Sequence, residues 1–263
     1  MLADYHMHTS FRDDSVYPME DAVKRAIHLG IDEICFTEHI DYGVKTDSNC
    51  DCEAYQKEFL RCKEKYRNQI QMKFGMEFGM QTATIPEFQA TFNKYPFDFI
   101  ILSCHQVDNQ EFYNQQFQTG RSQREYNRRY YEEILKVIKK YDDYSVLGHL
   151  DMIIRYDKLG KYPYVEVMDI IEEILKHVIA AGKGIEVNTS CYRYGLSDLT
   201  PSREILRLYK ELGGEILTIG SDSHAEKHVG VKLKETQEEL KGMGFQHFYT
   251  YNRMHMKKET SIT

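Results

Sequence analysis

The chain of 263 residues has a formal net charge of −7 at pH 7, which argues against binding to a nucleic-acid backbone through a basic face. Its length fits one large α/β domain or two small ones, and its 20 tyrosines and 13 phenylalanines supply ample apolar surface for a core. An acidic protein can still bind an anionic substrate where metal ions or a few arginines supply local positive charge.

The sequence shows no pattern typical of secretion or membrane insertion. No basic stretch followed by an apolar one stands near residue 1, and no apolar run of about 18 residues occurs. The six cysteines are irregularly spaced, and Cys35 and Cys104 lie in apolar runs typical of strands. We therefore expect free thiols in a reducing cytoplasm and no membrane partner.

Runs typical of strands alternate with runs typical of helices along the chain. Apolar or alternating segments predict strands at 2–7, 33–39, 73–79, 98–105, 145–151, 184–190, 215–224 and 245–251. Amphipathic segments, several of which end at glycine, predict helices at 19–29, 53–68, a short stretch after Pro86, about 123–140, 164–181, 202–212 and 233–242.

Seven strands that are each followed by a helix imply parallel pairing. At this length the natural architecture is one domain, residues 1–263, folded as a (β/α) barrel like the TIM barrel. The last, mostly aromatic strand would close the barrel or cover its base. An open doubly wound sheet is the alternative, but neither glycine-rich phosphate loop of its nucleotide-binding version occurs in the sequence.

Residue types that bind metals stand where the predicted strands end. Six of the 11 histidines and several carboxylates occupy these positions: His6, His8, Glu38, His39, Glu77, His105, His149, Asp151, Asp222 and His224, with Cys104 and Asn188. In a parallel barrel the carboxyl ends of the strands converge on one face. Because burying so many imidazoles and carboxylates is costly without a pairing cation, the sequence predicts a metal site there.

The mixture of imidazole and carboxylate suits zinc, manganese or iron better than calcium or a thiolate-bound metal. So many candidate ligands are too many for one ion and predict two or three ions. Glu77 stands alone at the end of the third strand and is well placed to bridge two ions about 3.5–4 Å apart. Such a pair of ions is the arrangement that clamps a phosphoryl group.

The residues at the strand ends resemble those of the PHP family, named after polymerase and histidinol phosphatase. The resemblance rests on motifs that follow in order from residue 6 to 224: His6-x-His8, Thr37-Glu38-His39, Glu77, Ser103-Cys104-His105, Gly148-His149 and Ser221-Asp222-Ser223-His224. The segments GHLDMIIRYD (148–157) and IEVNTSCYR (185–193) are similar to the histidinol-phosphatase branch. The resemblance implies a seven-stranded distorted (β/α) barrel with a two- or three-metal phosphoesterase site.

The resemblance also implies which residues hold each ion. His6, His8, Glu77 and Asp222 would hold the first ion, Glu77, His105 and His149 the second, and Asp14, His39 and His224 the third. Asp14 departs from some members of the family, which carry a histidine in this loop, and Asp13 could serve in its place. An oxygen ligand at this position would shift the metal preference.

By the same resemblance, the expected activity is hydrolysis of L-histidinol phosphate to L-histidinol and phosphate, in histidine biosynthesis. A metal-bound hydroxide would attack phosphorus in line, and a nearby acid would protonate the departing alkoxide. The candidates for this acid are Asp222, His224 and Asp151, and the residues expected to be catalytic are Glu77, Asp222 and His224.

Arg155 and Arg193 follow strand ends and could each grip the phosphate through two hydrogen bonds. A small phosphate ester with a cationic amine could also be drawn by an acidic residue such as Glu111 or Asp198. The two arginines, Arg155 and Arg193, are the predicted substrate-binding residues.

Two other functions stay open. Another PHP phosphoesterase would act on nucleotides or phosphopeptides and would need a groove for a base or a peptide. A non-catalytic metal-binding module would hold structural ions in closed, four-coordinate sites. The sequence does not decide between a monomer and a homo-oligomer.

Overall fold

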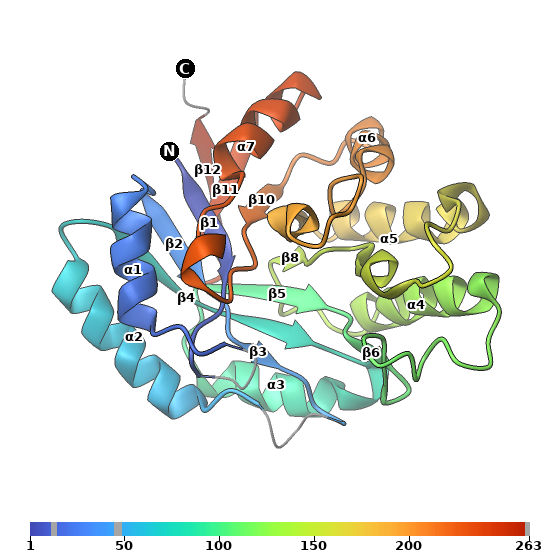
Figure 1. The fold of residues 1–263 in the computed structure, drawn as a ribbon, viewed down its shortest axis with the longest axis horizontal. Helices are drawn as coiled ribbons and strands as arrows, with labels where there is room; N and C mark the ends of the chain where they lie inside the picture. Colours follow the sequence, from blue (N-terminus) through green and yellow to red (C-terminus); the bar gives the residue numbers. More distant parts are fainter. Residues whose placement is uncertain (12–14, 45–48, 261–263) are drawn as a thin grey trace.

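The computed structural model describes residues 1–11, 15–44 and 49–260. Within these ranges the central sheet contains β1 (Ala3–Met7), β2 (Glu33–Phe36), β4 (Gln71–Gly79), β5 (Phe99–Ser103), β8 (Val146–Leu147), β9 (Gly184–Asn188) and β10 (Leu217–Gly220), with β3 (His39–Ile40) paired to β4. Every pair of neighbours in this order is parallel. The sheet curls into a nearly closed barrel of seven strands, which confirms the predicted barrel over the open sheet (Figure 1).

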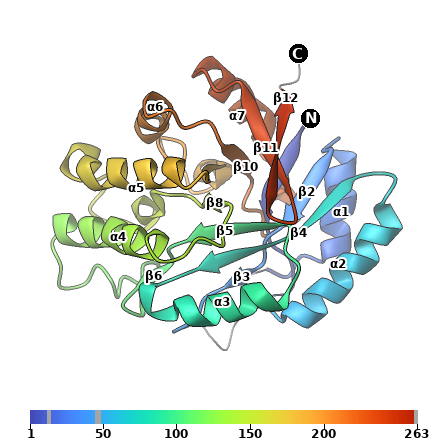
Figure 2. The same ribbon diagram turned by 180° about the vertical axis from the view of Figure 1, so that it is seen from behind.

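Each of these seven strands leads into a helix on the outside of the sheet (Figures 1 and 2). The helices are α1 (Met19–His28), α2 (Cys52–Tyr66), α3 (Ile85–Lys94), α4 (Gln123–Ile138), α5 (Met168–Ala180), α6 (Arg203–Glu211) and α7 (Leu233–Gly242). Short 3-10 helices lie at Thr82–Thr84, Met152–Tyr156, Tyr164–Glu166, Thr189–Tyr192 and Glu226–His228. The predicted helices are confirmed, except that the first turn expected at 164 is one of these 3-10 helices.

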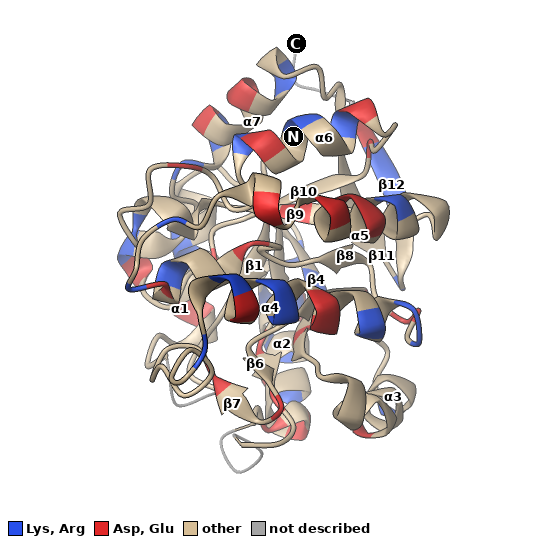
Figure 3. Cartoon of the chain, turned by 90° about the vertical axis from the view of Figure 1, so that its right-hand side faces the viewer, with Lys and Arg blue, Asp and Glu red and all other residues tan. Residues whose placement is uncertain are grey.

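Side-chain caps fix the start of several helices. The carboxylate of Asp51 accepts hydrogen bonds from the first backbone N–H groups of α2, and the Ser122 hydroxyl accepts one in the first turn of α4. Acidic and basic side chains are interspersed on the outer faces of α4 and α5 (Figure 3), where Arg128 pairs with Asp169 at 3.0 Å. None of the helices in the described ranges has the length and apolar content needed to cross a bilayer.

The barrel closes through a few hydrogen bonds between β1 and the segment that follows β10. The N–H of Asp222 donates to the carbonyl of His6, and the N–H of His8 donates to the carbonyl of Ser223, both at 2.8 Å. The buried Asp4 carboxylate crosses the same seam and accepts the N–H of Ser221 at 2.8 Å. Because the seam joins these two segments, the histidines of β1 lie beside the predicted ligands at 222 and 224.

Several strands end earlier than the sequence predicts. β2, β5, β8 and β10 end at Phe36, Ser103, Leu147 and Gly220, and apart from His39, which begins the short β3, the predicted site residues that follow them lie in loops. The physical reason is visible at His149 and Asp222, whose φ angles of 21° and 52° fall in the left-handed region. A residue with this backbone conformation cannot continue a strand.

The last predicted strand becomes the first half of a hairpin. β11 (His247–Asn252) pairs antiparallel with β12 (His255–Thr260), a strand that the sequence analysis missed. Arg253 and Met254 form the turn with φ angles of 49° and 63°, and both lack the Asn-Gly pattern that normally predicts such a turn. Their backbone N–H groups bind Asp98 at the start of β5, so the hairpin tip is anchored to the sheet (Figure 2).

The hairpin covers the base of the barrel and does not close it. Its Tyr249 and Tyr251 join a small buried cluster made of Tyr5, Cys35, Phe99, Ile101 and Val146. The ring of Phe99 lies 4.9 Å from the ring of Tyr5 and 4.9 Å from the ring of Tyr251, measured between centroids. Ile101 pairs in register with Glu77, so this apolar layer lies next to the polar end of the barrel.

Replacing Tyr251 by alanine should therefore destabilise the barrel and not only the hairpin. Loss of a large buried aromatic ring lowers the free energy of unfolding by roughly 3 kcal/mol, which denaturant unfolding of the variant would measure. Leu60→Ala is the control, since Leu60 is 56% exposed and should change stability little. Equal stability of Tyr251→Ala and the parent chain would contradict the packing role of the hairpin.

Candidate metal centre

One buried carboxylate, Glu77 in β4, lies at the middle of the site. Its Oε1 is 3.1 Å from Nε2 of His105 and 2.9 Å from Nε2 of His149. Its Oε2 is 3.2 Å from Nε2 of His6 and 3.6 Å from Nε2 of His8. Glu77 thus stands between two pairs of histidines, where the sequence predicts a bridging ligand.

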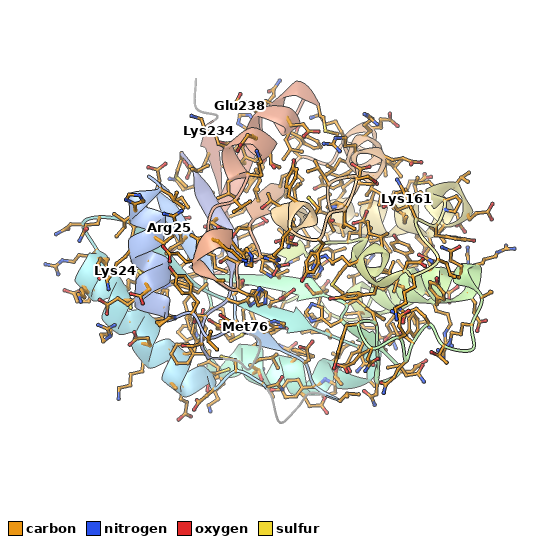
Figure 4. The ribbon with its side chains drawn as sticks, viewed as in Figure 1. Lys24, Arg25, Met76, Lys161, Lys234 and Glu238 are labelled. Atoms are coloured by element: carbon orange, nitrogen blue, oxygen red, sulfur yellow. The ribbon has the colours of Figure 1, made fainter. Side chains whose placement is uncertain are left out.

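The central position of β4 explains why Glu77 reaches so many partners. β4 is hydrogen-bonded to strands on both sides, and Glu77 is paired in register with His39 of β3. Met76, the preceding residue, is labelled near the centre of the molecule in Figure 4. Burial alone would raise the pKa of Glu77, but His6 and His105 outweigh it and hold that pKa well below its usual value. Glu77 is therefore an anion surrounded by imidazoles.

Asp222 completes the first predicted ligand set from across the barrel seam. Its Oδ1 lies 3.5 Å from Nε2 of His8 and 3.9 Å from Nε2 of His6. Burial raises the pKa of Asp222, but the nearby His6, His8 and Arg155 lower it more strongly, so the carboxyl is ionised. The structure thus brings His6, His8, Glu77 and Asp222 together.

A second group of imidazoles lies around His8. The ring centroid of His8 is 4.6 Å from that of His39 and 4.3 Å from that of His224. One ligand atom from each of these three histidines lies within 4.8 Å of the others. The remaining predicted ligand of the third ion, Asp14, and its alternative, Asp13, lie outside the described residues.

The burial and hydrogen bonding of His8 show whether these residues suit metal ions. His8 is buried, and neither of its ring nitrogens has a hydrogen-bond partner within the described part of the chain. Burial, followed by the positive potential of His224 and His39, holds the pKa of His8 well below its usual value. A neutral buried imidazole with an unused lone pair is costly unless a cation accepts that lone pair. The donor set therefore fits divalent ions.

These residues line a cavity of about 530 Å³ that opens to solvent. Besides the predicted ligands His39, Glu77, His105, His149, Asp222 and His224, its walls include Asp41, Gln106, Glu111, Tyr113, Met152, Arg155, Tyr156, Arg193, Tyr194 and His228. The cavity thus combines metal-binding side chains, two arginines and two further acidic residues, Asp41 and Glu111. A closed structural metal site would leave no such space for a further molecule.

The two predicted substrate residues, Arg155 and Arg193, lie side by side on the cavity wall. The guanidinium carbons of Arg155 and Arg193 stand 4.7 Å and 4.9 Å from the ring centre of Tyr194. Arg155 is almost fully buried and donates to Oδ2 of Asp222 at 3.3 Å. Arg193 is more exposed and donates to the Asp222 carbonyl at 2.8 Å. Both cations therefore stand next to a predicted ligand of the first ion.

The model of the PHP domain family matches residues 4–190 of the chain, which is more than half of its length. The chain belongs to the PHP family. This match agrees with the resemblance of the motifs at the strand ends, and the seven-stranded barrel is the fold that this resemblance implies.

Several proteins are similar to this PHP chain over most of its length. Histidinol-phosphatase of Lactococcus lactis is 31% identical over 261 residues, which cover 97% of this chain and 96% of that protein. A protein of Clostridium acetobutylicum named probable histidinol-phosphatase is 31% identical, over 89% of this chain and 91% of its own. The crystal structure of histidinol phosphate phosphatase from Lactococcus lactis, complexed with zinc, L-histidinol and phosphate, superposes with a TM-score of 0.89 at 30% identity and covers 98% of this chain and 99% of that one.

Two carboxylates that contact the PHP site were missed by the sequence analysis. Asp41 has Oδ1 2.7 Å from Nδ1 of His105, and Glu186 has Oε1 2.5 Å from Nδ1 of His6. Glu186 lies inside the apolar strand GIEVN, and a charged residue in such a strand is a signal that could have found it. Asp41 lies after the short β3 in a loop, where an acidic residue gives no such signal.

The structure corrects one candidate for the acid. Asp151 is buried, and its Oδ2 accepts hydrogen bonds from the Tyr164 hydroxyl at 2.5 Å and from the N–H of Ser202 at 2.9 Å. It is not among the residues that line the cavity. Asp151 therefore joins two loops of the barrel and has no access to a leaving group in the cavity.

Replacing Glu77 by glutamine should remove at least one bound zinc ion per chain. The amide keeps the shape of the side chain but loses the negative charge and one of the two oxygens, each of which faces one pair of histidines. The measurement is the zinc content of each protein, by elemental analysis after equilibration with the same zinc buffer. Asp151→Asn is the control, because it removes another buried carboxylate that lies outside the cavity. Parental zinc content in Glu77→Gln would rule out a bridging role for Glu77.

Proposed function

We propose that this protein is a metal-dependent phosphomonoesterase that hydrolyses L-histidinol phosphate to L-histidinol and phosphate. The observation that carries the proposal is the grouping of histidines and carboxylates around Glu77, in an open cavity that also presents two arginines. Similarity over nearly the whole chain to Lactococcus lactis histidinol-phosphatase supports the choice of substrate.

The proposed metal ligands are His6, His8, Asp14, His39, Glu77, His105, His149, Asp222 and His224. We propose that they hold two or three zinc, manganese or iron ions, with Glu77 shared between two of them. When bound, such ions lower the pKa of water and neutralise charge on phosphoryl oxygens. The zinc in the similar Lactococcus lactis structure and the ligand groups of this chain support this choice.

Arg155 and Arg193 would bind the phosphoryl oxygens. Both guanidinium groups lie against the ring of Tyr194, which keeps them on one wall of the cavity. Because Arg155 is tied to Asp222, Ser190 and Asn188, it is held rigidly and would orient the phosphate. Arg193 has more of its side chain exposed and can reach an incoming anion. Two positioned arginines supply the local positive charge that an acidic protein needs to hold an anion.

The proposed catalytic residues are Glu77, Asp222 and His224. Asp222 is held in its ionised form, so it has no proton to donate to the leaving oxygen. His224 lines the cavity, and its Nδ1 lies 3.0 Å from the carbonyl oxygen of Asp222. This contact holds the ring of His224 beside Asp222 on the cavity wall.

Glu111 is the proposed partner of the cationic part of the substrate. It lines the cavity from β7 (Gln110–Glu111), which pairs with β6 (Gln106–Val107) in the loop after β5. Asn114 donates to its Oε2 at 3.0 Å and helps to hold the carboxylate in place. Asp198, the other acidic candidate, pairs with Arg203 at 2.7 Å and does not line the cavity.

The proposal is tested by phosphate release from L-histidinol phosphate, an aryl phosphate and a nucleoside monophosphate. We expect a strong preference for L-histidinol phosphate, which a chelator abolishes and added zinc, manganese or iron restores. Equal slow turnover of the three esters would support a phosphoesterase activity but contradict L-histidinol phosphate as the preferred substrate. If the metal-loaded protein released phosphate from none of them, the non-catalytic metal-binding module would be the better account.

Glu111→Gln should weaken binding of L-histidinol phosphate selectively. A hydrogen bond to a charged group contributes about 1.5–3 kcal/mol, so KM for this substrate should rise roughly 10–100-fold. The aryl phosphate carries no amine, and its kcat/KM is the matched control, expected to stay within about twofold. An equal loss for both substrates would show that Glu111 acts on the site as a whole and does not recognise the cation.

A further inference from the structure

Asp41 and Glu186 do not belong to the predicted ligand set, yet each contacts a histidine that does. Oδ1 of Asp41 lies 2.7 Å from Nδ1 of His105, and Oε1 of Glu186 lies 2.5 Å from Nδ1 of His6. Both carboxylates are buried, at 2% and 0% exposure. In both histidines the opposite ring nitrogen, Nε2, faces Glu77. The distance from Nε2 to the nearer Glu77 oxygen is 3.1 Å for His105 and 3.2 Å for His6.

Each carboxylate also reaches a second histidine of the site. Oδ2 of Asp41 lies 3.4 Å from Nδ1 of His39, and Oε2 of Glu186 accepts the backbone N–H of His149 at 2.9 Å. Asp41 therefore joins a ligand in β3 to one that follows β5, while Glu186 in β9 joins a ligand in β1 to one that follows β8. The four histidines come from four different parts of the barrel.

A glycine lies against each carboxylate–histidine pair. A Cβ on Gly79, at the end of β4, would stand 1.8 Å from Oδ1 of Asp41 and 2.6 Å from Nδ1 of His105. A Cβ on Gly220, at the end of β10, would stand 2.6 Å from Oε1 of Glu186 and 2.3 Å from Cβ of His6. Neither glycine is among the residues with positive φ, so space and not backbone conformation demands glycine at both positions.

The contact at Nδ1 decides which nitrogen of the ring can bind a metal. A carboxylate accepts a hydrogen bond and therefore holds a proton on Nδ1, which leaves the lone pair on Nε2. A partner of this kind also fixes the plane of the ring and makes the ligating nitrogen more basic. In His6 and His105 the nitrogen left free is the one that faces Glu77.

We propose that Asp41 and Glu186 are positioning residues of the metal centre. They hold His105 and His6 in the Nδ1–H form with Nε2 directed at the metals, and Gly79 and Gly220 provide the space for these two contacts. This inference rests on the metal site of the proposed function. The competing role, in which Asp41 itself binds an ion together with His39 and His105, is an outcome of the test.

The first test is zinc affinity, measured by competition with a chromophoric chelator. Asp41→Asn and Glu186→Gln place an amide beside Nδ1, which can donate a hydrogen bond and so favour the wrong tautomer. Loss of such a partner typically lowers metal affinity about 10–100-fold, and we expect this for both variants. Gly79→Ala and Gly220→Ala should have a similar effect with no change of charge, because the added methyl group displaces the carboxylate and the histidine from each other.

Two variants are matched controls. Asp151→Asn removes a buried carboxylate that binds Tyr164 and Ser202, and Gly242→Ala adds a methyl group where nothing lies within 4 Å. Both should keep the parental zinc affinity. If the parent binds zinc and hydrolyses its substrate, but the four test variants bind zinc as tightly as the parent, the positioning role is wrong and the proposed function stands. If the parent binds neither zinc nor manganese nor iron, both fall.

The second measurement uses the parent chain and does not depend on the folding of any variant. In the zinc-loaded protein with ¹⁵N-labelled histidine, NMR should show a protonated Nδ1 and a metal-bound Nε2 for His6 and His105. An Nδ1 without a proton, or one bound to zinc, would overturn the proposal for that residue. If a crystal structure of the zinc-loaded protein showed an oxygen of Asp41 bonded to an ion, Asp41 would be a metal ligand and not a positioning residue.

Discussion

The site depends on the burial of one negative charge, Glu77, between the ring nitrogens of four histidines. Without metal ions, protons on two of these histidines, His6 and His105, offset the negative charge. Burial opposes protonation of His6, but Glu186, Glu77 and Asp222 outweigh it and raise its pKa well above the usual value. The pKa of His105 is also raised, since Asp41 and Glu77 outweigh burial. Metal ions would take the place of these protons, so metal binding and proton release are linked.

The rest of the barrel holds this arrangement in place. The seam between β1 and the segment after β10 brings His6 and His8 to Asp222, while the C-terminal hairpin fills the opposite end with aromatic rings. His149 and Asp222 adopt left-handed backbone conformations, which change the direction of their side chains just after the strands end. Such conformations are costly, and they persist only where the surrounding contacts determine them. The apolar end of the barrel thus stabilises the fold, and the polar end carries the chemistry.

Much of this site could be predicted from the sequence because its residues stand where successive strands end. His6, His8, Glu77, His105, His149 and Asp222 each follow or end a strand, and parallel strands bring such ends to one face. Asp41 and Glu186 could not be assigned in this way, because their role lies in a contact with histidines distant in sequence. The second strand of the hairpin was missed because Arg253 and Met254 carry no turn signal, although both have positive φ. Asp151 follows a strand end like the ligands, yet its side chain turns to Tyr164.

The most direct test of the shared carboxylate is anomalous diffraction at the zinc edge from a crystal of the zinc-loaded protein. We expect two peaks about 3.5–4 Å apart, one on each side of the Glu77 carboxylate. The ion nearer Oε1 should be bound by His105 and His149, and the ion nearer Oε2 by His6, His8 and Asp222. Peaks that leave Glu77 outside bonding distance, about 2.0–2.2 Å for zinc and oxygen, would contradict the account.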